Sequence, residues 1–393
     1  MITLTQPSIS ILPAFNRINY QIVSTNATEV GFKYVVKVYN SANELITTAY
    51  YDSPADPADA VEFDVSKFVS TQFEYTKGFY ETSTSSNSTN IIKGFYLKVY
   101  EYYEVAGEFV IVLASEVVSS TKYALAAAFP LLELDDWYDD VNLYNGVSNT
   151  TYKPLTAWDT IKVRETDAQV FGFVNTGFLT NVELLVTYNN ATTATYFIAK
   201  SGTTYPNVNY FQITPLTYGG SIASIQLFVN WNNGSARRYK FATLYTQECG
   251  KFDPIRMAYL NKYGAFDFFN FDLVNKTTLS IEKKGYQRNY DGSIYQSGGV
   301  IVKNINPVYF TNETQVWKII SDYLNDAQSE LIRELYSSPL VYMNIVNDNY
   351  IRPSWIPVKP TATSYEIKKT ATDKLFNLEL DLEFGLENNR QVI

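Results

Sequence analysis

The sequence contains no histidine, so acid–base chemistry in this chain would fall mainly to its carboxylates. Histidine is the commonest general base and metal ligand, and its absence excludes Ser–His and Cys–His nucleophile pairs. Two carboxylates facing each other can hydrolyse a glycosidic bond, and the candidate pairs are Glu165 with Asp167 and Glu248 with Asp253. A chain with 40 acidic residues contains such pairs by chance, and most of them solvate a surface. The sequence therefore predicts a protein that is not an enzyme and has no cofactor.

Four aspartates surround Trp137 and Tyr138, and they invite a calcium hypothesis. They are Asp135, Asp136, Asp139 and Asp140. Calcium takes about six to eight oxygen ligands, often from carboxylates. The spacing does not match the EF-hand loop, which also needs a glycine at its turn. We therefore predict a solvated acidic loop with no metal, and calcium binding is the alternative.

The amino-acid composition limits the classes of partner that the protein is expected to bind. Tyrosine (33) and phenylalanine (24) are abundant and charged residues make up 18%, which favours strands and adaptable surfaces over helical bundles. The net charge is −9 without a basic tract, so nucleic-acid binding is not expected, because it needs clustered Lys and Arg. No leader is recognised in 1–16 and no apolar run reaches about 18 residues, so neither secretion nor a membrane span is expected. The single cysteine, Cys249, is expected to be a buried, inert thiol.

The most informative stretch is Cys249–Asn289, because it predicts an aromatic β-hairpin. Ile255–Asn261 and Phe266–Leu273 are apolar and prone to form strands. A short turn at Lys262–Ala265 joins them, and its Gly264 can adopt a positive φ. Side chains alternate along a strand, so the second strand carries aromatic rings on both faces. It should lie between two layers of this chain, as a buried central hairpin, or between this chain and a partner. The candidate assembly contact is Phe266, Phe268, Phe269 and Phe271.

The same stretch resembles structural proteins of tailed phages that infect Bacteroidota, including crAss-like phages. The shared pattern is a cysteine, a polar spacer, an arginine before a hydrophobic residue, and then LNK-G-A-FD-F-F. Here it consists of Cys249, Arg256, Leu260, Asn261, Lys262, Gly264, Ala265, Phe266, Asp267, Phe269 and Phe271. Further matching segments near the N-terminus are Pro13–Phe15, INYQIVST from Ile18, FKYVVKVY from Phe32 and FDVSKFV from Phe63. The C-terminal order of helix, SSP, strand, PV, strand and strand resembles the closing part of the same proteins.

This resemblance implies a non-enzymatic structural protein of a tailed bacteriophage, a subunit of the tail or of the neck and tail-ring assembly. It would be made in the host cytoplasm and reside in the virion. Its partners would be further copies of itself in a symmetric ring and other tail or neck proteins, without nucleic acid or membrane as primary ligand. The alternative is a host-glycan-binding module at the tail tip or fibre, with sugars stacked on exposed aromatic rings. A third hypothesis is a depolymerase, which would need two carboxylates across a groove.

The predicted fold is mainly β and multidomain. Strand and turn spacing divides the chain into an immunoglobulin- or fibronectin-III-like sandwich at 1–123, a connector at 124–150, a second sandwich or jelly-roll-like domain at 151–248 and a β-rich assembly domain at 249–393. The first-domain strands are expected at Ser8–Leu12, Asn19–Ser24, Phe32–Asn40, Glu44–Tyr51, Ala60–Asp64, Gly94–Glu104 and Phe109–Ser119. Those of the second are expected at Ala168–Asn175, Val182–Asn189, Thr193–Lys200, Tyr210–Thr214, Ile222–Trp231 and Arg237–Tyr245.

The last domain should contain a helix at Asp326–Tyr336, because Asn325 is a suitable N-cap and Gln328 its capping-box partner. Its strands are expected at Thr278–Lys284, Val300–Tyr309, Val316–Ile320, Leu340–Val346, Thr361–Lys369 and Lys374–Phe384. Arg352–Pro360 has three prolines and is predicted to be an extended crossover. Thr82–Asn90 and Gly285–Gly299 are polar and are predicted to be loops that are disordered in the free protein.

Overall fold

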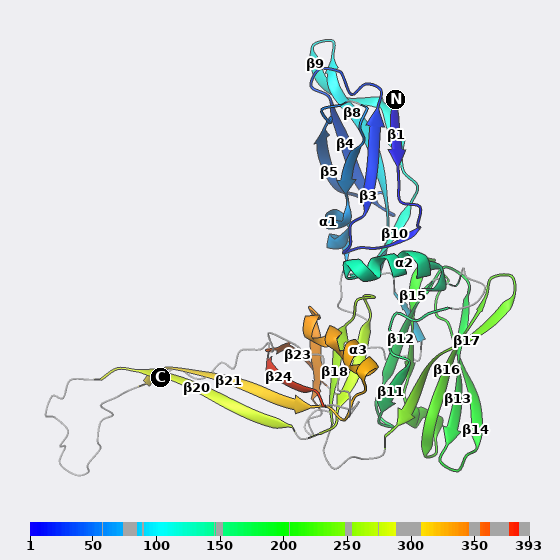
Figure 1. The fold of residues 1–393 in the computed structure, drawn as a ribbon, viewed down its shortest axis with the longest axis vertical. Coiled ribbons are helices and arrows are strands. Elements are labelled where there is room, and N and C mark those ends of the chain that lie inside the picture. The colour runs from blue at the N-terminus through cyan, green and yellow to red at the C-terminus, as the bar shows by residue number, and fades with distance from the viewer. Residues whose placement is uncertain are drawn as a thin grey trace. The chain divides into compact units, whose positions relative to one another are not determined.

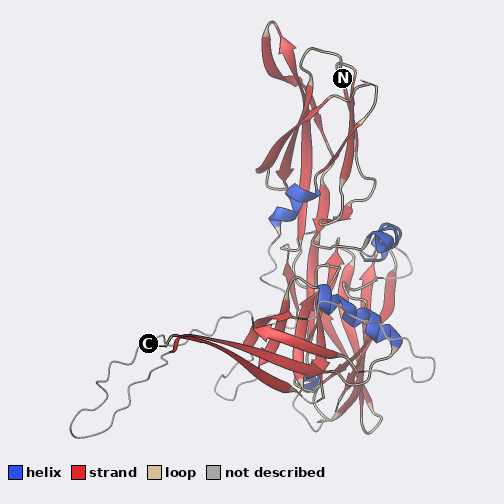
Figure 2. Ribbon diagram, turned by 60° about the vertical axis from the view of Figure 1, so that its left-hand side comes forward, coloured by secondary structure: helices blue, strands red, loops and turns tan. Residues whose placement is uncertain are grey.

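The structure is a computed structural model of a mainly β, multidomain protein, as predicted (Figures 1 and 2). It describes residues 1–56, 58–73, 85–88, 90–144, 146, 152–203, 205–247, 254–273, 275–287, 308–345, 354–361 and 377–384. The chain forms two compact units. The first comprises Met1–Gln247 with Leu260–Asp267, and the second comprises Glu248–Tyr259 with Phe268–Ile393. The predicted hairpin therefore contributes its turn to the first unit and most of its strands to the second.

The first unit begins with a two-sheet β-sandwich, and its membership of the immunoglobulin or fibronectin-III kind stays a prediction. One sheet has the order β1-β3-β6, from Ile2–Thr5, Asn19–Ser24 and Val61–Asp64. The other has the order β2-β10-β8-β4-β5, from Ile11–Pro13, Lys122–Leu125, Ile92–Val105, Lys33–Asn40 and Leu45–Asp52. Strand β9 (Glu108–Val118) pairs with β8, and a short helix, α1 (Ser66–Val69), follows β6. Tyr34, Val36 and Val38 of β4 enter the core between the sheets, as their alternation predicts.

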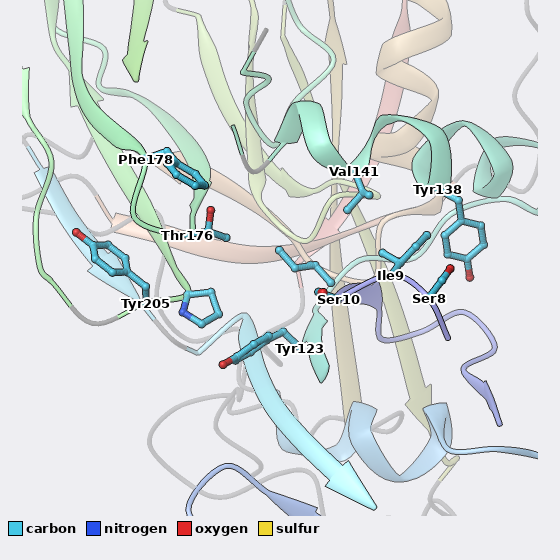
Figure 3. Close-up of a pocket in the computed structure, with 11 residues that line it drawn as sticks. Ser8, Ile9, Ser10, Tyr123, Tyr138, Val141, Thr176, Phe178 and Tyr205 are labelled. Atoms are coloured by element: carbon cyan, nitrogen blue, oxygen red, sulfur yellow. The ribbon is translucent and has the colours of Figure 1, made fainter. Parts of the chain in front are cut away.

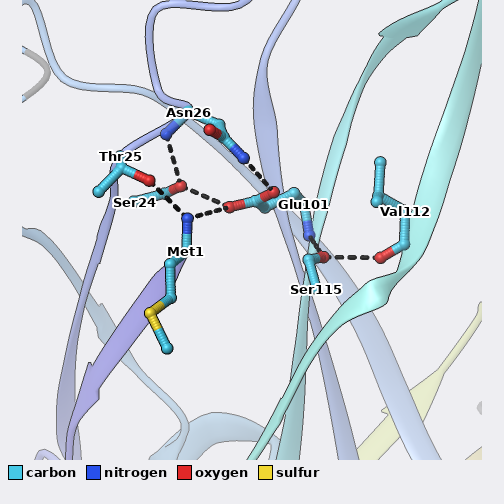
Figure 4. A network of polar contacts seen from close by, with 7 residues as sticks. All are labelled: Met1, Ser24, Thr25, Asn26, Glu101, Val112 and Ser115. Carbon is cyan, nitrogen blue, oxygen red and sulfur yellow. Dashed lines mark hydrogen bonds and ion pairs between the residues drawn. The ribbon is translucent and has the colours of Figure 1, made fainter.

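A buried carboxylate links the two sheets of this sandwich (Figure 4). Glu101 on β8 is 2% exposed and accepts hydrogen bonds from Ser24 Oγ of β3 at 2.5 Å and from Asn26 Nδ2 at 2.9 Å. The amino nitrogen of Met1 lies 3.6 Å from Oε1 of the same carboxylate. The backbone N–H of Glu101 donates to Ser115 Oγ of β9 at 2.8 Å. Buried charge is tolerated where hydrogen bonds replace its water, and these bonds do so here.

The polar segment Thr82–Asn90 is not simply an exposed loop, contrary to the prediction. Its residues Ser85–Ser88 form β7, which pairs antiparallel with β15 (Asn207–Ile213) of the second sandwich. Small hydroxyl side chains can join a sheet edge because the ladder is made by backbone groups. The composition of the segment could not reveal this long-range pairing.

The predicted acidic loop around Asp135–Asp140 is instead part of helix α2, Leu131–Tyr144. Trp137, Val141 and Tyr144 lie on one helical stripe, at spacings of four and three residues, and all three are buried. The acidic side chains lie on other faces, where Asp135, Asp136 and Asp139 are exposed. The prediction of solvated carboxylates fits this arrangement, whereas the assignment as a loop is wrong, because tertiary burial of the stripe stabilises a helix.

The second sandwich of the first unit follows α2. Its larger sheet has the order β11-β17-β16-β13-β14, from Thr160–Val163, Ala236–Thr246, Ile222–Asn232, Leu179–Tyr188 and Thr193–Ala199. Its smaller sheet has the order β12-β15-β7, where β12 is Gln169–Asn175. Ile225, Leu227, Val229 and Trp231 of β16 are buried, as their alternation predicts. Gly234, with φ 107°, forms the turn to β17, and its N–H donates to Asn232 Oδ1.

The sheet built on the hairpin has the order β19-β18-β22-β23-β24-β21-β20. Its strands are Phe266–Phe271, Ile255–Leu260, Val341–Ile345, Ser354–Pro360, Glu379–Phe384, Val308–Ile320 and Lys276–Gly285. Arg352–Pro360 was predicted to be an extended crossover. Most of it is instead strand β23, which pairs with β22 and β24. In β24, Leu380 and Leu382 are buried while Glu379 and Asp381 are exposed, as the alternation predicts.

The segments 288–307 and 362–376 lie outside the described residues. Most of the predicted loop Gly285–Gly299 falls in them, as do nearly all of the predicted strands Val300–Tyr309 and Thr361–Lys369.

Helix α3 (Asp326–Ser337) confirms the prediction made from its caps. The Asn325 side chain accepts from the backbone N–H of Gln328 at 2.8 Å, and the Gln328 side chain accepts from the backbone N–H of Asn325 at 3.2 Å. This reciprocal pair satisfies two amides that the first helical turn leaves unpaired. Ile332 and Leu335 provide its buried side chains.

Candidate functional site

The four phenylalanines of the candidate assembly contact lie mainly inside the protein. Phe266, Phe268 and Phe271 are 7%, 3% and 0% exposed, and Phe269 is half-buried. Within the second unit, the Phe268 ring contacts Trp355 edge-on at 5.8 Å between centroids, and the Arg256 guanidinium lies 5.0 Å from the Phe268 centroid. Three of the four rings are therefore covered by neighbours within the chain, and Phe269 keeps part of its surface exposed. That the hairpin forms an assembly contact, directly or by bracing it, stays a prediction.

The turn of the hairpin explains why the chain needs the residues of the LNK-G-A pattern. Asn261 Oδ1 accepts from the backbone N–H groups of Tyr263 and Ala265, at 3.0 and 3.1 Å, and so fixes the turn. Gly264 has φ +79°, and a Cβ there would lie 2.2 Å from the Ala126 carbonyl oxygen. Glycine is therefore required both by the backbone conformation and by the close approach.

The same turn is fixed to the rest of the first unit. Lys262 Nζ lies 2.5 Å from Glu133 Oε2 of α2, and the Lys262 carbonyl accepts from the Ala128 N–H at 2.8 Å. The Tyr263 ring contacts Phe129 edge-on, with centroids 5.4 Å apart, and is tilted against Tyr144 at 5.6 Å. The residues that carried the resemblance at this turn thus have structural roles within the chain.

The carboxylate pairs do not form a catalytic arrangement among the described residues. Asp167 is 5% exposed, and its carboxylate accepts from the Arg164 backbone N–H at 2.9 Å and lies 3.4 Å from the Arg164 guanidinium. It therefore stabilises its own turn, and Glu165 beside it is half-exposed. Glu248 and Asp253 lie outside the described residues, as does Cys249.

No group of three or more histidine, cysteine, aspartate or glutamate side chains within the described residues is placed to hold a metal ion. Of the helices that the structure describes, none has the length and apolar character to cross a membrane.

The outer face of the β5-β4-β8-β9 sheet presents aromatic rings and lysines. Tyr39 and Tyr96 stack with centroids 5.3 Å apart, and Lys98 Nζ lies 5.8 Å from the Tyr39 centroid. Tyr100 donates a hydrogen bond to Glu116, and this bond, followed by the ion pair with Lys98, lowers the pKa of the Glu116 carboxyl. Sequence reasoning missed this face, although the alternation of Tyr and Lys along β8 was the available signal.

The same face continues into exposed rings and aliphatic side chains. Tyr102 stacks on Phe109 at 6.0 Å and meets Tyr50 edge-on at 6.1 Å. Exposed apolar side chains on this face are Leu45, Tyr50, Phe109 and Val118 of β5 and β9. Several large apolar side chains exposed on neighbouring strands are typical of an interaction surface.

The second unit exposes a two-stranded arm made of β20 and β21 (Figure 1). The strands pair antiparallel from Lys276–Lys318 to Gly285–Val308. All ten residues of β20 are exposed, including Leu279 and Ile281, and β20 is the edge strand of its sheet. Strand β24 pairs with β21 only at Val316–Ile320, so beyond that point the described arm has two strands. A two-stranded ribbon of this kind is marginally stable alone.

Comparison with known proteins returned no match, either to a family model or to a curated protein sequence.

Proposed function

We propose that this chain is a non-enzymatic structural protein of a tailed bacteriophage particle, a subunit of the tail or of the neck and tail-ring assembly. The observation that carries the proposal is the β20–β21 arm. Its edge strand exposes every side chain, and a strand with unpaired backbone groups is a template for pairing with another chain. The charged residues of β20 lie at its two ends, whereas its middle, Thr277–Ile281, is uncharged and open to strand addition.

The arm suits one recurring contact between copies of the chain. Strand addition uses main-chain hydrogen bonds for affinity and alternate side chains for specificity. On β20, Thr277, Leu279, Ile281 and Lys283 share one face, so Leu279 and Ile281 provide its apolar centre. If each subunit donates its arm to the next, the contact is heterologous and closes into a ring after a fixed number of copies. Tail and neck assemblies have this rotational symmetry.

Other features support the same proposal. The exposed aromatic face of the first sandwich resembles the composition of protein–protein interfaces, in which Tyr, Phe and Arg are enriched. The resemblance of the hairpin and the N-terminal strands to structural proteins of Bacteroidota phages supports the virion setting.

The test is assembly of the purified chain and of two matched double variants. Leu279→Asp with Ile281→Asp places two charges on the apolar face of β20. Thr278→Asp with Ser280→Asp places the same two charges on the opposite face of the same strand. Because all four positions are exposed, both variants should fold with unchanged circular dichroism. We expect the chain and the second variant to form a discrete oligomer by light scattering, and the first variant to stay monomeric.

Two results would count against the proposal. Equal assembly of both variants would show that the apolar face of β20 is not a contact. A gold-labelled antibody against the purified chain should also decorate the tail or neck of the phage particle, and decoration of the capsid, or none, would contradict the assigned location.

A further inference from the structure

A pocket of about 620 Å³ lies within the first unit and is not accounted for by an assembly role (Figure 3). The segment before and within β2, together with β10, α2, the turn after β12 and the segment before β15, contributes to it. The lining residues are Ser8, Ile9, Ser10, Ile11, Tyr123, Tyr138, Val141, Thr176, Phe178, Tyr205 and Pro206. Its volume is within the range of roughly 300–1,000 Å³ that is typical of small-molecule sites.

The lining combines aromatic rings with hydroxyl groups. Figure 3 shows Tyr205, Phe178 and Thr176 at one end, Tyr123 below the middle, and Tyr138 beside Ser8 at the other end. Phe178, Tyr123 and Tyr138 are half-buried and Tyr205 is 38% exposed, so the rings are held by the protein and still present surface to the pocket. Rigid amphipathic rings bind ligands at low entropic cost.

Several hydroxyl groups of the lining are free to bind a ligand. Those of Ser8, Ser10, Tyr123 and Tyr138 make no hydrogen bond to another residue in the part of the chain that the structure describes. The Tyr205 hydroxyl accepts from Lys200 Nζ at 2.7 Å, which leaves its own proton available for donation. A hydroxyl group can donate one hydrogen bond and accept two, so this lining can satisfy a ligand rich in hydroxyl groups.

The chemistry of the lining selects among ligand classes. None of the lining side chains carries a formal charge, and the ammonium of Lys200 beside them is already hydrogen-bonded to the Tyr205 hydroxyl, so an anionic ligand would lose its water with little compensation from a counterion. A purely apolar ligand would desolvate the hydroxyl groups without replacing their hydrogen bonds. A neutral saccharide meets both demands, because a pyranose has apolar C–H faces that pack on rings and hydroxyl groups around its edge.

We propose that this pocket binds a neutral oligosaccharide, with one sugar ring packed on Tyr205 and Phe178 at one end and a further sugar unit hydrogen-bonded by Ser8, Ser10 and Tyr138 toward the other. The lining residues all belong to the first unit, and none belongs to β20 or β21. Tyr205 and Phe178 act as the stacking surface, whereas Ser10 and Tyr138 select for the hydroxyl pattern of the sugar.

The experiment uses the full chain with the neutral disaccharides maltose, lactose, mannobiose and chitobiose, and with sialyllactose and a hyaluronan disaccharide as anionic counterparts. Saturation-transfer NMR detects binding, and titration calorimetry gives Kd. We expect at least one neutral sugar to bind and both acids to bind more weakly. Tyr205→Ala should weaken binding by roughly tenfold, and Ser10→Ala or Tyr138→Phe severalfold, as loss of one hydrogen bond predicts.

The control is Tyr245→Ala, which removes a tyrosine that is 50% exposed and outside the pocket. It should leave Kd unchanged, and all variants should keep the circular dichroism of the parent chain. Absence of binding by every neutral sugar, tighter binding of the acids, or full affinity in Tyr205→Ala would each overturn the proposal. Binding of an extended peptide in place of the sugars would overturn it as well.

Discussion

The side chain of Asn261 donates a hydrogen bond from Nδ2 to the backbone carbonyl of Leu155, at 2.9 Å and across 106 residues of sequence. The same side chain accepts from two amides of its own turn through Oδ1. One asparagine therefore shapes the hairpin turn and joins it to the second sandwich of the first unit. The donors and acceptors of these three hydrogen bonds are all buried. Each bond therefore replaces a hydrogen bond to water that the group loses on folding.

Asn261→Ala should destabilise the chain strongly. It removes the partners of two buried N–H groups and one buried carbonyl, and unsatisfied groups of this kind cost about 1–3 kcal/mol each before relaxation. We expect a loss of about 2–4 kcal/mol, measured as a shift of the urea midpoint. Asn190→Ala is the matched control, because Asn190 is exposed and bonds only to Thr192 beside it. Equal midpoints for the two variants would contradict the anchoring role.

Phe268→Asp should behave as a core substitution. Phe268 is 3% exposed and packed between Trp355 and Arg256. Its replacement by a carboxylate should cost several kcal/mol, roughly as large core deletions of about 3–5 kcal/mol do, and should reduce soluble expression. Leu279→Asp, at an exposed position of β20, should express normally. A well-folded Phe268→Asp variant that fails only to assemble would instead place this ring at an interface.

The pair of Glu183 and Arg238 makes the stability of the second sandwich depend on pH. Arg238 donates from Nε and Nη2 to the two carboxylate oxygens, at 2.8 and 2.9 Å, and this lowers the pKa of Glu183 below its ordinary value of 4.5. A lowered pKa in the folded state stabilises the protein above the ordinary pKa, and the contribution is lost as pH falls through the lowered value.

Glu183→Gln should therefore reduce stability at neutral pH, by about 0.5–1 kcal/mol because water and salt screen the pair. The difference between the parent chain and the variant should shrink as pH falls below 4.5. Urea unfolding at a series of pH values measures it. A difference that is constant or grows toward acid pH would show that the ion pair is not its source.

Calcium should leave the melting temperature of the chain unchanged. Asp135, Asp136 and Asp139 of α2 are exposed, and Asp140 is engaged by Lys153 Nζ at 2.8 Å. A helix brings carboxylates together mainly in pairs at spacings of three or four residues, whereas calcium takes about six to eight oxygen ligands wrapped around the ion. A ligand that binds only the folded state must raise the melting temperature. A clear rise in millimolar calcium, absent with magnesium, would contradict the prediction.

Local sequence signals correctly predicted those helices, strands and turns whose conformation is determined within one short segment. Helix α3 follows from Asn325 and Gln328, because a capping box is completed within four residues. The alternation of buried and exposed side chains in β24 and β16 follows from the sequence, because successive side chains of a strand point to opposite faces. The hairpin turn follows from Gly264, which is required by a positive φ. In each case the determining interaction lies within a few residues of the segment it determines.

Other elements could not be predicted because their partners lie far away in the sequence. The serines of β7 become a strand only because β15 offers backbone groups to pair with. Helix α2 is stabilised by a buried stripe whose Tyr144 packs against Tyr263 of the distant hairpin turn. The aspartates between the positions of this stripe concealed it, since they suggested a loop.

The sequence by itself determined the mainly β class, the alternating core faces, the capped helix and the aromatic hairpin, because period and local hydrogen bonding act over short distances. The tertiary structure alone decided which large apolar residues are buried and which are exposed to solvent. Phe266, Phe268 and Phe271 look equally suited to a core or an interface until their neighbours cover them. Leu279 and Ile281, less conspicuous in the sequence, stay exposed because no described segment covers the face of β20 on which they lie. Burial depends on segments brought together by folding, and no local pattern contains that information.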